Sequence, residues 1–169
     1  MTSDKFNRCI GFVLQHENAY DKAGNVICEH DPRDSGGATK YGVDQSSHPH
    51  IDVCHLTEQD AKQIYFDGEW TRCRCEQLPI HFDLAMLDTA VNCGMGTATK
   101  MLQKALGVTV DGIIGNLTLT AAATASHAVL GAFLAAREAY YNKLPKKLRD
   151  TYLKGWLARV KDLRKAVEL

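Results

Sequence analysis

The chain has 169 residues, and its 20 basic and 20 acidic residues give a formal net charge of zero. This length allows a compact domain with a substantial hydrophobic core, and the apolar runs are far shorter than the ~20 residues that a membrane span requires. The composition therefore argues against stable membrane insertion and against low-complexity disorder.

The first predicted element is an amphipathic helix that begins near Ser3 or Asp4, either of which can cap it. Five apolar side chains recur at helical spacing along it: Phe6, Cys9, Ile10, Val13 and Leu14. Glu17 falls on the same apolar face near the end of the helix. Burial and the negative end of a helix both favour the protonated form of a carboxyl group, which a general acid needs. Glu17 is therefore the candidate general acid.

Residues 20–43 are predicted to be irregular with a short β-hairpin, because turn-forming residues punctuate the stretch. Residues 26–28 are the strand candidate, and Gly36 and Gly37 permit a tight turn. The hairpin is expected to bring further polar groups alongside Glu17. An acid on a rigid helix beside such groups suggests the cleft of a glycosidase.

Cysteines and histidines gather between residues 28 and 75. The set consists of Cys28, Cys54, Cys73, Cys75, His30, His48, His50 and His55. No C-x-x-C pair, the specific signal of a zinc site, is present. Reduced structural thiols, a structural metal site and disulfides all stay open, and cytoplasmic synthesis favours the first.

The next helix is predicted to begin at Thr57, which forms a capping box with Asp60, and to end about Gly68. Trp70 follows, either as a substrate-facing aromatic or as a core residue. Pro79 opens a further helical region, whose buried side is predicted to carry Leu84, Leu87 and Val91. Asp88 and Asn92 share one helix face there, and can support a site or cross-link helices.

The rest of the chain is predicted to be helical, with a stop at Gly107 and a break at Pro145. Residues 143–169 hold nine Lys or Arg against three acidic residues. Such a segment can face a polyanion or simply form a solvated helix face. Without a nucleic-acid motif or interleaved aromatic residues, nucleic acid is not an expected partner. The predicted fold class is mainly α, or α+β: a helical bundle with a small β-hairpin.

Short motifs follow one another over nearly the whole chain, in the order HEN, DPRDSGGATKYGV, LTEQDAKQIYFDGEW, LDTAVNCGMGTATKMLQKALGV, DGIIGNLTL and GWLARV. In this order they resemble the family 108 glycoside hydrolases, which are muramidases of phage endolysins and secretion-linked bacterial lysozymes. The resemblance implies a lysozyme-like fold with the hairpin next to the active-site cleft. It also implies a catalytic region over residues 1–93 and a helical, peptidoglycan-binding-like region over residues 94–169, packed into the same compact unit.

The resemblance places the family's catalytic glutamate, which lies in a Glu-Gly-Gly motif, at Glu17. Asn18 and Ala19 stand where the motif has its glycines. Asp34 is the expected second carboxylate, with Asp31 in reserve, and Thr39 is expected to orient a water molecule. The expected substrate-binding residues are Tyr41, Tyr65, Trp70, Asp88 and Asn92, and Tyr41 is also a candidate to fix Glu17.

The expected function is an N-acetylmuramidase that cleaves the β-1,4 bond between N-acetylmuramic acid and N-acetylglucosamine, without a metal or cofactor. Two alternatives remain, a non-catalytic peptidoglycan-binding module and a zinc-dependent wall hydrolase that uses the cysteine and histidine cluster. A lytic transglycosylase is a chemical variant of the muramidase.

The expected partners are peptidoglycan glycan strands. The N-terminus lacks a signal-peptide layout, so synthesis in the cytoplasm is expected, with a holin or an export machinery providing access to the periplasm or cell wall. The chain is expected to be monomeric.

Overall fold

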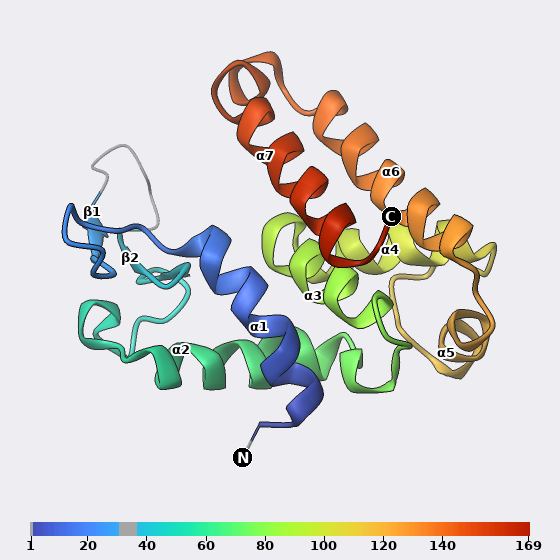
Figure 1. The fold of residues 1–169 in the computed structure, drawn as a ribbon, viewed down its shortest axis with the longest axis horizontal. Helices are drawn as coiled ribbons and strands as arrows, with labels where there is room; N and C mark the ends of the chain where they lie inside the picture. Colours follow the sequence, from blue (N-terminus) through green and yellow to red (C-terminus); the bar gives the residue numbers. More distant parts are fainter. Residues whose placement is uncertain (1, 31–36) are drawn as a thin grey trace. The chain divides into compact units, whose positions relative to one another are not determined.

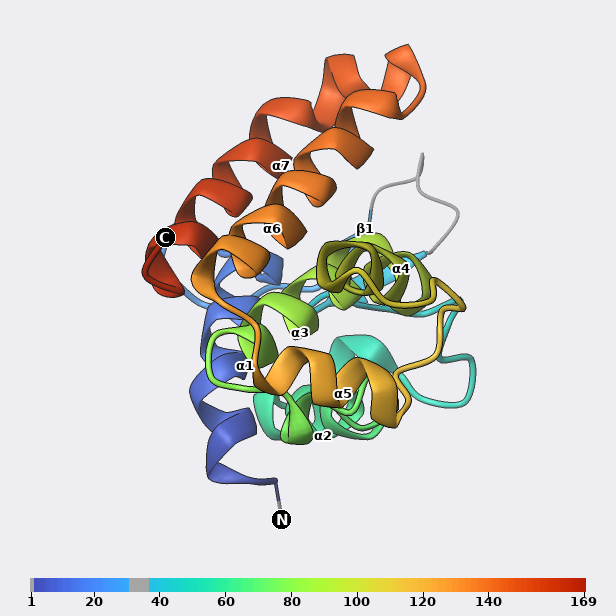
Figure 2. The same ribbon diagram turned by 90° about the vertical axis from the view of Figure 1, so that its right-hand side faces the viewer.

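The structure is a computed structural model that describes residues 2–30 and 37–169. It divides into two compact units, Met1–Gly68 and Glu69–Leu169, which we call the N-terminal unit and the C-terminal unit. Helices dominate, and the strands form one small antiparallel sheet (Figures 1 and 2). The mainly α fold class is therefore confirmed. Across the described ranges, no helix combines the length and the apolar character needed to cross a membrane.

In the N-terminal unit, α1 (Asp4–Glu17) forms where the sequence predicts it. Ser3 caps the helix, because its hydroxyl oxygen accepts a hydrogen bond from the backbone N–H of Phe6 at 3.1 Å. All five predicted apolar side chains are buried. The ring of Phe6 meets that of Phe66 edge-on, with centroids 5.2 Å apart. This packing fixes the helix that ends at Glu17.

The sheet of the N-terminal unit consists of β1 (Glu29–His30), β2 (Ala38–Lys40) and β3 (Val43–Asp44), paired in that order. The strand predicted at residues 26–28 is wrong, because Val26 makes only an isolated bridge with Tyr20. The carboxylate of Asp21 accepts hydrogen bonds from the backbone N–H groups of Ala23 and Asn25. These hydrogen bonds stabilise a local turn, and the first strand of the sheet begins only after it, at Glu29.

After the sheet, η1 (Val53–His55) is a short 3₁₀ helix, and α2 (Glu58–Tyr65) begins with the predicted capping box. The Thr57 hydroxyl accepts from the N–H of Asp60 at 3.2 Å, and the Asp60 carboxylate accepts from the N–H of Thr57 at 2.9 Å. A π-helical turn, η2 (Phe66–Trp70), continues α2 and contains the boundary between the units.

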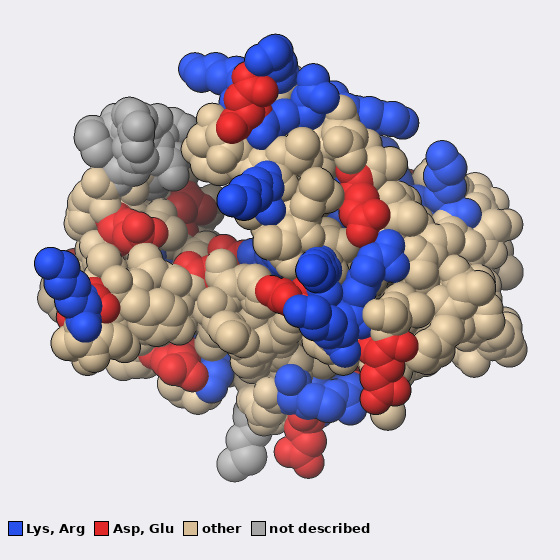
Figure 3. Space-filling model, turned by 45° about the horizontal axis from the view of Figure 1, so that its top comes forward, with Lys and Arg blue, Asp and Glu red and all other residues tan. Residues whose placement is uncertain are grey.

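The C-terminal unit contains η3 (Cys75–Gln77), α3 (Phe82–Cys93), α4 (Met95–Leu106), α5 (Asn116–Ala123), α6 (His127–Lys143) and α7 (Lys146–Ala166). Both the stop at Gly107, which has φ +69°, and the break at Pro145 are confirmed. Helix α3 packs against α4 and α6, and α6 and α7 run side by side (Figure 2). Lys and Arg side chains are exposed along this pair (Figure 3).

Helix α3 is buried almost all round, from Phe82 and Asp83 through Ala85 to Ala90. The prediction of one buried side was therefore wrong in part, since Leu84 and Val91 are half-exposed while Asp88 and Thr89 are fully buried. A helix that has neighbours on several sides lacks a single apolar stripe. Its buried polar residues must find partners, and they are described below.

Candidate functional site

Two side chains of the N-terminal unit converge on the backbone of Gly42. A Cβ atom added to Gly42 would lie 2.8 Å from Cβ and 2.9 Å from Cγ of Glu17, and would collide with the hydroxyl oxygen of Tyr65. Only a residue without a side chain allows this approach. Glu17 is thus held at the end of α1 against the turn that joins β2 and β3, as a half-buried carboxylic side chain.

The turn against which Glu17 packs has an unusual backbone. Tyr41 has φ +56° and Gly42 has φ +76°, and they form a two-residue connection between the paired residues Lys40 and Val43. Two positive φ angles are typical of the type I′ hairpin turn. A tyrosine is rare in this conformation. The hydroxyl of Tyr65 donates to the backbone carbonyl of Tyr41 at 2.9 Å and stabilises the turn.

Tyr65 therefore holds a position that the sequence suggested for Tyr41. It is only 4% exposed, and its hydroxyl lies at the Gly42 backbone beside Glu17. This makes Tyr65 a positioning residue for the turn. The half-buried ring of Tyr41 instead lies under the ammonium group of Lys40, 5.4 Å from the ring centroid.

The residues after Glu17 adopt a backbone that needs no glycine. Asn18 has φ −78° and ψ 132°, and its N–H donates to the carbonyl of Leu14 at 3.0 Å. Ala19 is not among the described residues with positive φ. Replacing the two glycines of the family motif with Asn18 and Ala19 therefore introduces no backbone strain at Glu17.

Of the remaining expected catalytic residues, one lies within the described part of the chain and the others lie outside it. Thr39 lies in the middle of β2, opposite Glu29 on one side and Asp44 on the other, and is half-buried. The expected second carboxylate, Asp34, and its reserve, Asp31, lie outside the described residues.

Trp70 occupies a core position. Its side chain is 1% exposed, and its indole N–H donates to the carboxylate of Glu76 at 3.1 Å within the C-terminal unit. A glycan strand does not reach a side chain that is buried in this way. Of the two alternatives for Trp70, the structure therefore favours the core residue over the substrate-facing aromatic.

Asp88 is at the centre of a buried charge network in the C-terminal unit. Arg137 of α6 donates to its Oδ2 at 2.6 Å, and Arg159 of α7 donates to its Oδ1 at 2.7 and 2.9 Å. Asp88 and Arg137 are fully buried, and Arg159 nearly so. Asp88 thus cross-links three helices, and its side chain is not available to a substrate.

Asn92 belongs to the same network. Its side-chain carbonyl accepts from the hydroxyl of Tyr141, and that hydroxyl also accepts from Nε of Arg137 at 2.6 Å. Asn92 is half-buried, so a substrate contact there stays a prediction.

The network fixes its own protonation states. Burial alone would raise the pKa of Asp88, but the charges of Arg137 and Arg159 and their hydrogen bonds outweigh it, and the pKa lies below its ordinary value. Burial raises the pKa of Tyr141, so that its phenol stays protonated. Removing one member of such a buried cluster leaves an uncompensated buried charge, which is strongly destabilising.

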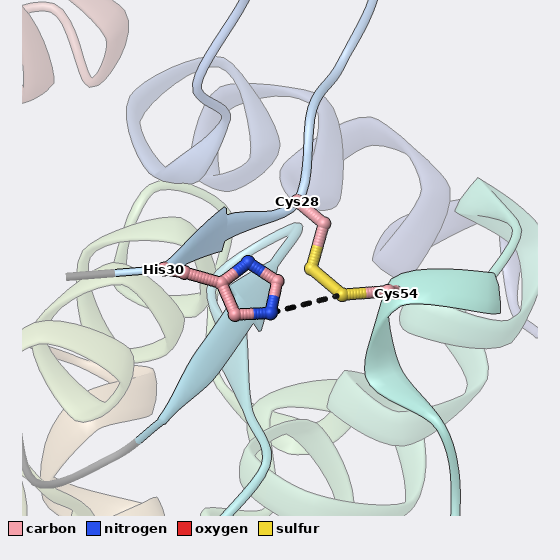
Figure 4. Close-up of side chains that lie close together, drawn as sticks. All are labelled: Cys28, His30 and Cys54. Atoms are coloured by element: carbon pink, nitrogen blue, oxygen red, sulfur yellow. Dashed lines mark hydrogen bonds between the residues drawn. A yellow bond between two sulfur atoms is a disulfide. The ribbon is translucent and has the colours of Figure 1, made fainter. Parts of the chain in front are cut away.

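The cysteine and histidine cluster is divided by the structure. Cys28 and Cys54 form a disulfide, which corrects the expectation that favoured reduced thiols at these positions. Cys73 and Cys75 are outside the disulfide and are buried. Burial, with a contribution from Glu69, raises the pKa of the Cys73 thiol to about 12, which makes it unreactive at neutral pH. His30 lies against the disulfide, with Nε2 4.0 Å from Sγ of Cys54 (Figure 4).

A turn in the C-terminal unit is organised by one buried amide. The side-chain N–H₂ of Gln103 donates to the carboxylate of Asp111 at 2.7 Å and to the carbonyl of Ile113 at 3.0 Å. Its carbonyl accepts from the N–H of Gly112 at 2.8 Å. This explains the Leu-Gln and Asp-Gly pairs of the motif over residues 102–119. Beside the turn lies a groove of about 530 Å³, lined among others by Arg72, Arg74, Thr99, Gly112 and Ile114.

Two family models match the chain, over ranges that differ from those of the two compact units. A family model described as Glycosyl hydrolase 108 matches residues 10–94, and one described as Predicted Peptidoglycan domain matches residues 97–161. The solved "Structure of Brucella abortus SagA" covers 96% of this chain and 92% of that chain, at 30% sequence identity and a TM-score of 0.81. No curated protein matches the chain.

The chain belongs to the glycosyl hydrolase 108 family. The lysozyme-like character of the fold is confirmed with it. The two family matches together support a peptidoglycan hydrolase. The expected division of function at residues 93 and 94 stays a prediction, because the compact units divide elsewhere, at residues 68 and 69.

Sequence reasoning missed the partners of the expected site residues. Gly42 could have been found from its place between two strands, where a two-residue connection requires positive φ. Arg137 and Arg159 could have been found from the need of a buried Asp88 for a cation. The motif GWLARV, which carries part of the family resemblance, contains Arg159 itself.

Proposed function

We propose that this glycosyl hydrolase 108 protein is an N-acetylmuramidase, which cleaves the β-1,4 bond between N-acetylmuramic acid and N-acetylglucosamine in peptidoglycan. The proposal is carried by one observation, the fixed position of Glu17 against Gly42 and the Tyr65 hydroxyl at the β2–β3 turn. Such a carboxyl group, restrained on two sides by the fold, suits the general acid of glycoside hydrolysis.

In the proposed mechanism the Glu17 carboxyl group gives its proton to the oxygen of the leaving sugar, while positive charge develops at the anomeric carbon. Asp34 either attacks that carbon or activates a water molecule on the opposite face of the sugar, and the hydroxyl of Thr39 orients the water. Separations of about 5–5.5 Å between the two carboxyl groups give retention of configuration, and about 6.5–9.5 Å give inversion. Tyr65 and Gly42 act indirectly, because they restrain Glu17.

Peptidoglycan recognition is proposed to involve the C-terminal unit as well. This rests on the match of residues 97–161 to a peptidoglycan domain. The groove beside the Gln103-organised turn is lined in part by Arg72 and Arg74, and arginine suits the carboxylates of peptide stems. Arg74 also donates to the side chain of Gln77 and to the carbonyl of Ile114. A holin in a phage system or a dedicated export step in a bacterium would supply access to the wall.

The test is product analysis on purified sacculi with the wild type and the variant Glu17→Gln, which removes the proton donor at nearly constant volume. The wild type should release muropeptides with reducing N-acetylmuramic acid ends. The variant should lose at least about 10²-fold in rate while its circular dichroism stays unchanged.

The matched control is Glu58→Gln, because Glu58 is an exposed glutamate of the same unit that pairs with Lys62 one helical turn away. Its activity should equal that of the wild type. Anhydro-sugar products would make the protein a lytic transglycosylase instead. Binding of sacculi by both proteins without any released sugar would make it a non-catalytic wall-binding module.

A further inference from the structure

The disulfide and the neighbouring histidine of the N-terminal unit form a cluster that the proposed hydrolysis does not use. The ligand atoms of Cys28, His30 and Cys54 all lie within 4.8 Å of one another. Figure 4 shows the imidazole ring of His30 directed at the sulfur of Cys54. Two sulfur atoms and one imidazole nitrogen in this space are a set of zinc ligands as soon as the sulfur atoms are not bonded to each other.

We propose that, when the Cys28–Cys54 disulfide is reduced, Cys28, His30 and Cys54 bind one Zn²⁺ ion, with water completing a tetrahedral site. Zinc lies about 2.3 Å from thiolate sulfur and about 2.0–2.1 Å from imidazole nitrogen, so tetrahedral ligand atoms are roughly 3.6–3.8 Å apart. His30 and Cys54 are already near this separation, at 4.0 Å. The two sulfur atoms must move apart, and the sulfur of Cys28 already lies within 4.8 Å of the His30 ring nitrogen.

The backbone around the cluster is held by contacts that do not involve the disulfide. Cys28 directly precedes β1 (Glu29–His30) and is two positions from His30, a spacing that puts two side chains on one face of an extended chain. The carbonyl of Cys54 accepts from the ammonium group of Lys40 in β2 at 3.0 Å, and the N–H of Cys54 donates to the carboxylate of Asp52 at 3.1 Å. These bonds keep Cys54 opposite β1 after reduction.

The cluster is also accessible. Cys28 and Cys54 are half-buried and His30 is exposed, whereas the other cysteine pair, Cys73 and Cys75, is buried in the C-terminal unit. A dithiol reductant and a hydrated metal ion can therefore reach Cys28 and Cys54.

Reduction followed by metal binding converts the oxidised state into the zinc-bound state. A dithiol reductant gives two electrons and two protons to the Cys28–Cys54 bond and becomes a disulfide itself, and two protein thiols form. Zn²⁺ then binds as both thiols lose their protons to the solvent, while neutral His30 supplies its ring nitrogen. The consequence is that the loop from residue 28 to residue 54 is cross-linked in both states, by a covalent bond when oxidised and by a metal ion when reduced.

The experiment uses the whole chain, treated with a phosphine reductant, freed of metal, and titrated with Zn²⁺ against a chromophoric chelator. One equivalent should bind the reduced protein and none the oxidised protein. Substitution with Co²⁺ should give thiolate-to-metal charge-transfer absorption in the reduced protein. Mutation of a residue that only supports a metal ligand typically weakens metal binding roughly 10–100-fold. His30→Ala should weaken Zn²⁺ binding by more than this, because His30 is itself a ligand in the proposal.

The matched control is His50→Ala, an exposed histidine outside the cluster, which should bind like the wild type. Cys28→Ser/Cys54→Ser keeps the other four cysteines and should lose the site. If the reduced protein unfolds, one equivalent of Zn²⁺ should restore its circular dichroism. The proposal is overturned if Zn²⁺ neither binds nor refolds the reduced chain, if His30→Ala binds as tightly as the wild type, or if the double cysteine variant retains the site. This inference is independent of the proposed muramidase activity, since every readout is binding or folding.

Discussion

The C-terminal unit is helical and contains the long pair α6 and α7, which buried charges join to α3, whereas the N-terminal unit has α1, the short helix α2 and strands of two or three residues. In the C-terminal unit, Asp88 and its two arginines connect α3, α6 and α7. In the N-terminal unit, a disulfide, a capping box and the close approach at Gly42 perform the same task. The candidate acid lies in the unit with less regular structure. Substitutions beside Glu17 should change activity, whereas substitutions in the Asp88 cluster should change stability.

The largest effect is expected from Asp88→Asn, which leaves two buried arginines without their counter-charge. We expect a loss of about 3–5 kcal/mol in the free energy of unfolding, because a buried ion pair that loses one partner is strongly destabilised. Denaturant unfolding of the whole chain measures this loss. Asp150→Asn removes an exposed ion pair one turn from Lys146 and should cost less than about 1 kcal/mol. Equal losses in both variants would contradict the role of Asp88.

The pH dependence of the free energy of unfolding provides a second test of the same network. The pKa of Asp88 is lowered in the folded protein, so its stabilisation is fully present above the ordinary value of about 4 and is lost as the pH falls through the lowered pKa. Stability of the wild type should therefore fall below about pH 4, and Asp88→Asn should remove this part of the decline.

The second effect is expected from Cys28→Ser/Cys54→Ser, which opens a connection between residues 26 positions apart. The loss should be about 2–4 kcal/mol. Hydrogen exchange should show lower protection in the N-terminal unit and unchanged protection in α3, α6 and α7. Reduced, metal-free wild type should behave like this variant. Loss of protection in both units alike would show that they do not respond separately.

A smaller change in stability, but a larger one in activity, is expected from Gly42→Ala. Its methyl group would meet Glu17 and Tyr65, and its φ of +76° adds strain of about 1–3 kcal/mol. Displacement of Glu17 should lower the hydrolysis rate by about 10²-fold. Gly24→Ala is the matched control, because Gly24 has φ +85° and open space around it, so it should cost stability alone. Unchanged activity in Gly42→Ala would contradict the assignment of the site.

The smallest effect is expected from Thr57→Ala, which removes the cap of α2 and should cost about 1 kcal/mol. Thermal unfolding measures it. Because Thr57 and Asp60 cap each other, the double variant Thr57→Ala/Asp60→Ala should lose less than the sum of the two single losses. Additive losses would mean that the two hydrogen bonds act separately.

Features set by neighbouring residues could be predicted from the sequence. The apolar face of α1, the cap at Ser3, the capping box at Thr57 and the helix stop at Gly107 depend on residues within about one turn, and all are present. Glu17 was recognised for the same reason, because it extends a local helical pattern.

Features that join distant residues could not be predicted. The partners of Asp88 are 49 and 71 positions away, Cys54 is 26 positions from Cys28, and Tyr65 is 24 positions from Tyr41. No spacing rule connects such pairs, because tertiary packing brings them together. The polar character of Asp88 signalled a special position, but only the packing of α6 and α7 distinguishes an ion cluster from a sugar contact.

The connection between Asp88 and Arg159 also bears on the order in which the protein can mature during synthesis. A ribosome that has just translated the last residue of α3, Cys93, still has to add 66 residues before Arg159 is joined to the chain. Until then Asp88 lacks one of its two arginine partners. Burial of α3 is therefore less favourable than in the finished protein. Completion of the C-terminal unit is thus delayed almost until translation of α7 ends, and any nascent chain shorter than this carries an incomplete core.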